Sequence, residues 1–231
     1  MDTDTGIGGA AGQFPSTDLS LLAAANGELS NQALERVVAL YWKPVYRFIR
    51  LKFRKSNEDA KDLTQGFFTT ALQRDFFRRF DPSKAPFRAY IRVSVDRFAA
   101  NQRAAEKRQK RGGDVEFEPL EENQVTTESA EEAFEREWRR QLFTLALDDL
   151  RAHCNESGKT LHLRLFEAYD LSGGERPSYS DLAVCHHIAE TSVTNHLAWA
   201  RRMLRTFVAE RLRDVTSGEG ELRKEMRRVW S

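Results

Sequence analysis

The stretch SYSDLAVCHHIAETSVTNHLAWARRML, from Ser178 to Leu204, has the apolar spacing of two helices joined by a tight turn. Leu182 is expected on the first helix and Ile188 in the turn. On the second helix, apolar residues recur at steps of three to four, the spacing of one buried helical face. They are Val193, Leu197, Ala200 and Leu204. The stretch therefore predicts either a helix-turn-helix or an ordinary amphipathic helical hairpin.

The second of these helices keeps a polar face. Short donors and acceptors near the N-terminus of such a helix can reach base edges in the major groove, and arginines beyond them can neutralise phosphates. This pattern is typical of a DNA recognition helix, and a merely solvated basic face is the alternative. The outward positions are Thr194, Asn195 and Ala198, followed by Arg201, Arg202 and Arg205.

The same stretch holds one cysteine and three of the five histidines of the chain, which raises the question of a metal site. Tetrahedral zinc needs four converging ligands, and ligands on one helix must lie three or four residues apart to share a face. Cys185, His186 and His187 are consecutive, so they point in different directions around a helix and one or two of them at most can join His196. We therefore expect no metal and no cofactor.

Composition limits the class of protein. The chain has 231 residues, 40% of them hydrophobic, which suits one large domain or two small ones. Two cysteines are too few for a disulfide framework, and no apolar run has the length of a membrane helix, so we expect a cytoplasmic protein without a membrane segment. The net charge is only +1, but residues 97–111 hold six basic side chains and one acid, whereas residues 114–137 hold ten acids and one arginine.

The order of helical patterns and turn signals predicts an all-α protein with two helical domains joined by a flexible acidic linker, the second domain containing the helix-turn-helix. No strand pattern is seen. The expected segments are a disordered lead (1–16), a first domain (17–111), the linker (112–130), a second domain (131–213) and a C-terminal extension (214–231).

The segment EDAKDLTQGFFTTAL, residues 58–72, is predicted to be an amphipathic helix. Its polar side mixes carboxylates with a glutamine and lacks long basic side chains, so it can offer hydrogen-bond acceptors to a basic partner. The alternative is a polar side that is only solvated. The apolar side is expected to hold Ala60, Leu63, Phe67, Phe68 and Ala71, and the polar side Asp59, Asp62, Gln65, Gly66 and Thr69.

The loop FDPSKAP, residues 80–86, leads into the predicted helix FRAYIRVSVDRFAANQRAAEKRQKR, residues 87–111. Basic side chains interleaved with aromatic ones suit a single nucleic-acid strand, because the charges follow phosphates and the rings receive unstacked bases. The buried stripe of this helix is expected to be Phe87, Ile91, Val95 and Phe98, and the exposed face Arg88, Arg92, Asp96, Arg103 and Lys107.

These motifs, in this order, resemble the bacterial sigma-70 family of RNA polymerase sigma factors, of the extracytoplasmic-function (ECF) type, over nearly the whole chain from Phe14 to Arg213. The helix of residues 58–72 looks like the signature helix that binds the polymerase clamp. The opening stretch is similar to the promoter-reading helix-turn-helix, with His187 at the turn position usually given to glycine. The matching positions are Tyr179, Leu182-Ala183, Ser192-Val193, Leu197 and Trp199-Ala200-Arg201.

The resemblance implies three sets of site residues. Those facing the minus-thirty-five element are Ser192, Thr194, Asn195, Ala198, Trp199, Arg201 and Arg202. Those facing the minus-ten element are Asp81, Pro82, Ser83, Lys84, Arg88, Arg92, Asp96, Arg97, Asn101, Arg103 and Lys107. Those binding the polymerase are Asp59, Asp62, Gln65 and Thr69.

The function implied by the resemblance is binding of core RNA polymerase, promoter recognition, DNA melting and initiation of transcription. Its partners would be core RNA polymerase, promoter DNA, and an anti-sigma factor or other regulator, with no membrane partner. The alternatives are a stand-alone helix-turn-helix regulator and a sigma mimic that titrates an anti-sigma factor. The sequence carries no phosphate-binding glycine loop and no nucleophile motif, so we expect no catalytic residues and no enzyme.

Overall fold

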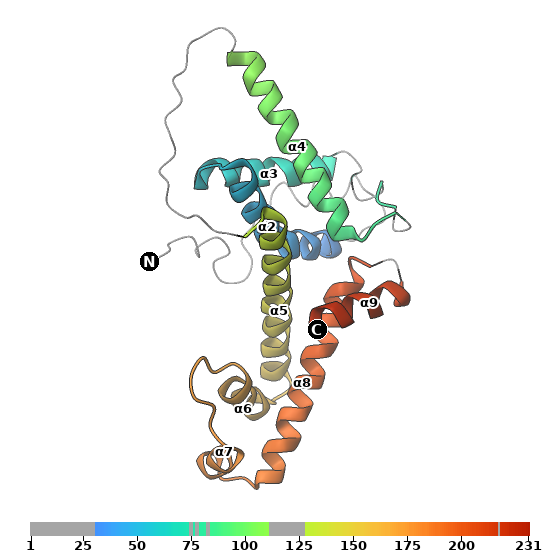
Figure 1. Cartoon of the computed structure of the whole chain (residues 1–231). Helices are drawn as coiled ribbons and strands as arrows, with labels where there is room; N and C mark the ends of the chain where they lie inside the picture. Colours follow the sequence, from blue (N-terminus) through green and yellow to red (C-terminus); the bar gives the residue numbers. More distant parts are fainter. Residues whose placement is uncertain (1–30, 74–75, 77–78, 82–83, 111–127, 217) are drawn as a thin grey trace. The chain divides into compact units, whose positions relative to one another are not determined.

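The computed structural model describes residues 31–73, 76, 79–81, 84–110, 128–216 and 218–231 (Figure 1). Within these ranges all regular structure is helical, which confirms the all-α prediction. The predicted lead (1–16) and most of the predicted linker (112–127) lie outside the described residues. The helices are α2 (Asn31–Phe53), α3 (Asn57–Gln73), α4 (Phe87–Lys110), α5 (Ala130–Glu156), α6 (Thr160–Asp170), α7 (Tyr179–His186), α8 (Glu190–Arg213) and α9 (Glu219–Trp230).

The chain divides into two compact units, and the boundary between them falls within α5, after Gln141. The first 12 residues of α5, Ala130 to Gln141, belong with unit 1, and the remainder of that helix belongs with unit 2. The domain boundaries expected from the sequence stay a prediction.

Unit 1 is built around the apolar face of α2. Tyr41, Phe48 and Ile49 of this helix are almost completely buried, and α3 and α4 pack on it. Aromatic rings fill the space between α3 and α4: Phe67 meets Phe98 edge to face, with ring centroids 5.8 Å apart. Edge-to-face pairs of this kind stabilise a core beyond simple burial. The core therefore fixes which sides of α3 and α4 remain accessible.

Unit 2 is organised by the long helix α8. Its buried residues recur at steps of three to four, as the sequence predicts, and they are Val193, Leu197, Ala200, Leu204, Val208 and Leu212. Helices α6, α7 and α9 pack on this stripe. Arg211 of α8 also donates two hydrogen bonds, of 2.7 and 2.6 Å, to the carboxylate of Asp149 in α5.

Candidate nucleic-acid interface

The start of α7 is fixed by a reciprocal capping box. The backbone N–H of Asp181 donates to Oγ of Ser178 at 3.0 Å, and the backbone N–H of Ser178 donates to Oδ2 of Asp181 at 2.9 Å. These bonds satisfy two of the N–H groups that a helix start leaves unpaired. Hydrogen bonds from the side chain and backbone of Ser178 lower the pKa of Asp181.

The turn between α7 and α8 depends on a left-handed residue. His187 has φ 54° and ψ 42°, the conformation that usually favours glycine at the end of a helix. The backbone N–H of Ile188 then donates to the carbonyl of Ala183 at 3.0 Å, and that of His187 to the carbonyl of Val184 at 3.3 Å. The structure therefore forms the tight helix-turn-helix corner even though a histidine occupies the glycine position.

The N-terminal half of α8 presents a polar face. Thr194, Asn195 and Ala198 are exposed, and Ser192 is partly exposed. Arg202 is exposed one turn farther along. All seven residues expected to face duplex DNA are therefore exposed or partly exposed on one helix, with short side chains first and cations after them.

Arg201 is exposed but makes an ion pair with another helix of unit 2. Its Nε donates to Oδ2 of Asp170 at 2.9 Å and its Nη2 to Oδ1 at 2.9 Å. Its guanidinium also lies 5.6 Å from the ring centre of Tyr169. Arg201 thus joins α8 to the end of α6.

Trp199 is partly buried in a cluster of rings between α6 and α8. Its ring meets His162 edge to face at 4.8 Å, and Nζ of Lys159 lies 5.1 Å from its centre. Nε2 of His162 and Nδ1 of His196 are 2.9 Å apart, a hydrogen bond that requires at least one neutral imidazole. Burial lowers the pKa of His162, and the neighbouring His196 and Lys159 lower it further.

The face of α4 predicted to hold the minus-ten strand is partly covered. The expectation that Arg88 is exposed is wrong: its residue is only 5% exposed, because the guanidinium stacks on Trp138 at 4.3 Å and pairs with Glu135 at 3.2 Å. Asp96 pairs with Lys52 at 3.0 Å.

The other described residues predicted to face the minus-ten element are more exposed to solvent. Arg97, Asn101 and Arg103 are exposed and Arg92 is partly exposed. In the preceding loop, Lys84 is exposed and pairs with the partly exposed Asp81 at 3.1 Å. Pro82, Ser83 and the side chain of Lys107 lie outside the described residues.

The polar side of α3 lies at the surface, as its pattern predicts. Asp59, Asp62 and Gln65 are exposed and Thr69 is partly exposed. Opposite them, Thr64 is fully buried and donates from Oγ1 to the carbonyl of Ala60 at 2.6 Å. The four residues predicted to bind the polymerase therefore all reach the surface on one side of this helix.

A scan against protein families matched the model described as ECF sigma factor over residues 21–211. The match covers far more than half of the chain. The chain belongs to the ECF sigma factor family. Sigma factors of this family act in the initiation of transcription and bind DNA, and they are regulatory transcription factors. Searches among curated proteins and among solved structures gave no match.

In this ECF sigma factor, the family match ends within α8, so α9 lies beyond it. Leu222 and Val229 of α9 are buried against the unit, and the ring of Trp230 meets Phe143 at 5.1 Å. The residues Thr194 and Asn195 of α8 remain exposed with α9 in this position. Within unit 2, α9 is therefore a packed element that leaves Thr194 and Asn195 exposed.

Several partners of the site residues were not found by sequence reasoning. His162, Lys159 and Asp170 each contact a residue of α8, yet none belongs to a motif. The separations of 34 residues for His162 with His196 and 31 for Asp170 with Arg201 explain why, since no local pattern connects such positions.

Within the described ranges, no group of three or more His, Cys, Asp or Glu side chains is arranged to hold a metal ion. Both cysteines are free, Cys154 buried and Cys185 exposed. Every helix there is too short or too polar to cross a bilayer.

Proposed function

We propose that this sigma factor uses three surfaces in initiation. The polar side of α3 binds core RNA polymerase, α4 with the loop before it holds the opened minus-ten strand, and the N-terminal half of α8 enters the major groove of the minus-thirty-five element. The protein itself supplies binding and positioning, and the polymerase supplies the chemistry.

The observation that carries this proposal is the exposed polar start of α8. It follows a capped helix and a tight left-handed turn, and it presents Thr194, Asn195 and Ala198 where short side chains can approach base edges. Arg202 is exposed farther along the same helix. A cation there would neutralise a phosphate of the bound duplex.

The proposed polymerase surface is supported by the chemistry of α3. Asp59, Asp62 and Gln65 are exposed acceptors on one side of a helix whose other side is packed into unit 1. Acceptors held on a rigid helix suit a partner surface rich in arginine and lysine, because carboxylates form charge-assisted hydrogen bonds with those groups.

The proposed strand-capturing surface combines charges and rings. Arg97, Asn101 and Arg103 are exposed along α4, and the guanidinium of Arg103 lies 5.4 Å from the ring centre of Phe53. Single-stranded DNA binds such surfaces through phosphates on cations and unstacked bases on flat groups. Holding bases out of the duplex stabilises the open promoter.

The remaining expectations from the sequence form part of the same proposal. Residues 17–111 and 131–213 would act as the polymerase-binding and duplex-reading domains, and residues 112–130 as an acidic tether. The tether would lie in a basic channel of the polymerase and be displaced by growing RNA. An anti-sigma factor or other regulator is the further expected partner, and the cytoplasm the expected compartment.

The test is co-purification of the full chain with core RNA polymerase, followed by transcription in vitro from a pool of genomic fragments. We expect stable association and new start sites that share two spaced motifs. Association without new transcripts would instead favour an antagonist that titrates a regulator. No association, with tight binding to duplex DNA alone, would favour a stand-alone repressor.

A further inference from the structure

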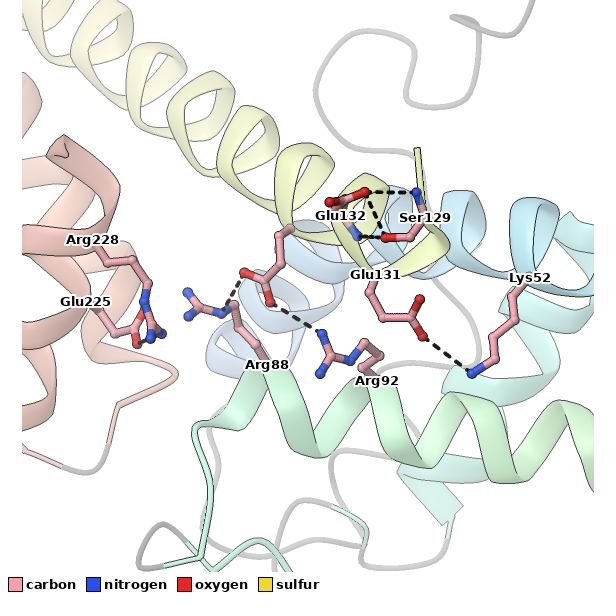
Figure 2. A network of polar contacts seen from close by, with 9 residues as sticks. Lys52, Arg88, Arg92, Ser129, Glu131, Glu132, Glu225 and Arg228 are labelled. Carbon is pink, nitrogen blue, oxygen red and sulfur yellow. Dashed lines mark hydrogen bonds and ion pairs between the residues drawn. The ribbon is translucent and has the colours of Figure 1, made fainter. Parts of the chain in front are cut away.

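The first 12 residues of α5, residues 130–141, belong to unit 1 and contact α2 and α4. We call this segment the α5 shield. Its start is fixed by Ser129 and Glu132: the backbone N–H and Oγ of Ser129 each donate to Oε2 of Glu132 at 2.9 Å, and the backbone N–H of Glu132 donates to Oγ of Ser129 at 3.1 Å. Figure 2 shows this cap beside the ion pairs of the shield.

Two carboxylates of the α5 shield pair with cations of α2 and α4. Glu135 lies 3.2 Å from Nε of Arg88 and 3.8 Å from Nη1 of Arg92. Glu131 lies 3.5 Å from Nζ of Lys52 (Figure 2). Arg88 and Arg92 belong to the surface proposed to hold the minus-ten strand. Carboxylates and DNA phosphates bind arginine and lysine through the same charge-assisted hydrogen bonds, so the two kinds of anion can compete for one cation.

Apolar contacts hold the α5 shield in place. Phe134 is 1% exposed and lies against the rings of Tyr41 and Phe48, with centroids 6.5 and 6.0 Å away. Trp138 is 2% exposed under the guanidinium of Arg88. Burial of two large aromatic side chains opposes release of the segment. A single DNA strand must therefore displace both ion pairs and rings to reach Arg88.

We propose that the α5 shield is an intramolecular competitor of single-stranded DNA, which covers part of the minus-ten surface until the promoter opens. The inference rests on the proposed function of α4. The occupant is a segment of this chain, and the competing ligand is a DNA strand whose phosphates pair with Arg88, Arg92 and Lys52.

The polymerase-binding surface is separate from the shielded one. Asp59, Asp62 and Gln65 are exposed while the α5 shield is in place. Docking on the polymerase therefore needs no release of α5, whereas capture of the strand does. This order keeps the free protein from binding single strands and leaves its affinity for the polymerase intact.

The test compares isosteric variants of the full chain with a matched control. Glu135→Gln and Glu131→Gln each remove one shielding carboxylate. Glu137→Gln makes the same change of charge on the same segment, and Glu137 has no ion pair or hydrogen bond of its side chain within the described residues. Circular dichroism establishes that all three fold alike. The probe is a fluorescein-labelled single-stranded DNA of about 12 nucleotides, a length within the usual site sizes.

We expect Glu135→Gln to tighten binding of this strand about fivefold relative to Glu137→Gln. The strand then no longer has to break the ion pairs of Glu135, and a partly exposed ion pair contributes an affinity change of this order. Affinity for core RNA polymerase should be the same in both variants. Equal affinities of the two variants for the strand would overturn the proposal. That result would not bear on the proposed function, which is tested by transcription with the wild-type holoenzyme.

Hydrogen–deuterium exchange provides a second readout on the wild-type chain. Saturating single-stranded DNA should speed exchange of the amides of residues 130–141, because the strand displaces the segment. Slower or unchanged exchange there, with the strand bound, would show that DNA does not compete with the α5 shield. Failure of the wild-type chain to support transcription with core polymerase is a different result, and it contradicts the proposed function itself.

Discussion

Arg201 and Asp170 are joined by two parallel hydrogen bonds of 2.9 Å, which connect α8 with the end of α6. The pair is bidentate, the strongest arrangement of a guanidinium and a carboxylate. It raises the pKa of Arg201, with the hydrogen bond to Asp170 as the main cause. A residue that the sequence predicts to face DNA thus also links two helices of unit 2.

Substitution of Arg201 should accordingly affect stability. We expect Arg201→Ala to lower the free energy of unfolding by about 1 kcal/mol, as for a partly exposed bidentate pair. Arg202→Ala serves as the control and should change it by less than about 0.5 kcal/mol. Urea unfolding of both variants provides the comparison, and equal stabilities would mean that the pair with Asp170 contributes nothing.

Arg202 should instead contribute to DNA affinity without regard to sequence. In the holoenzyme, Arg202→Ala is expected to weaken every promoter alike and to reduce the slope of log affinity against log salt by about one, the effect of one lost phosphate contact. Affinity measured at several salt concentrations tests this. A promoter-selective loss would show that Arg202 reads bases.

Asn195 should contribute to sequence preference. Its amide can make paired hydrogen bonds to a base edge. We expect Asn195→Ala to relax the preference at one upstream base pair and to cost about 1–3 kcal/mol on the preferred promoter. Transcription from a library randomised upstream of the start sites measures both effects. If the variant loses activity on all sequences alike, the assigned orientation of α8 is wrong.

The His162–His196 pair predicts acid sensitivity of unit 2. Burial, His196 and Lys159 depress the pKa of His162 below its unfolded value. The unfolded chain then binds a proton more readily than the folded one. Stability present above the unfolded pKa of about 6.5 is therefore lost progressively as the pH falls from that value through the lower folded pKa. Urea unfolding between pH 7.5 and pH 5 should show this loss.

The variant His162→Gln should flatten this pH dependence, because glutamine does not titrate. His186→Gln, a change in the partly exposed residue at the end of α7, is the matched control and should keep the wild-type slope. The same pH slope in all three proteins would assign the acid sensitivity to other groups.

The left-handed conformation of His187 predicts a stabilising substitution. A residue with a Cβ atom at φ 54° carries a steric cost that glycine avoids. We expect His187→Gly to raise the free energy of unfolding by about 1 kcal/mol, with an unchanged denaturant slope. His187→Val should lower it, since a β-branched residue tolerates this conformation least. A destabilised glycine variant would indicate that the histidine side chain makes a compensating contact.

Removal of residues 217–231 should destabilise unit 2 and should not release activity. Leu222 and Val229 are buried in α9, and their exposure is expected to cost about 3 kcal/mol. Thermal unfolding of the truncated chain measures this. Raised basal transcription by the truncated chain, at a temperature where it stays folded, would contradict the finding that α9 leaves Thr194 and Asn195 exposed.

The sequence by itself determined the local features of the fold and of the candidate site. The stripe of Val193, Leu197 and Leu204 predicted α8, and the polar side of residues 58–72 predicted the exposed side of α3. These predictions succeed because helical periodicity relates residues that are neighbours in the chain as well as in space. The same reason explains why Thr194 and Asn195 were correctly expected at the surface.

Only the tertiary structure decided which of the charged residues are covered by, or paired with, residues of another helix. Helical spacing placed Arg88 on the outer face of α4, but Trp138 and Glu135 of a distant helix cover it. Arg201 likewise follows the pattern of a DNA-facing residue and is paired with Asp170. The long side chain of an arginine can pair with a carboxylate on a different helix. Whether it does so depends on how helices far apart in the chain pack together, and no local sequence pattern encodes that packing.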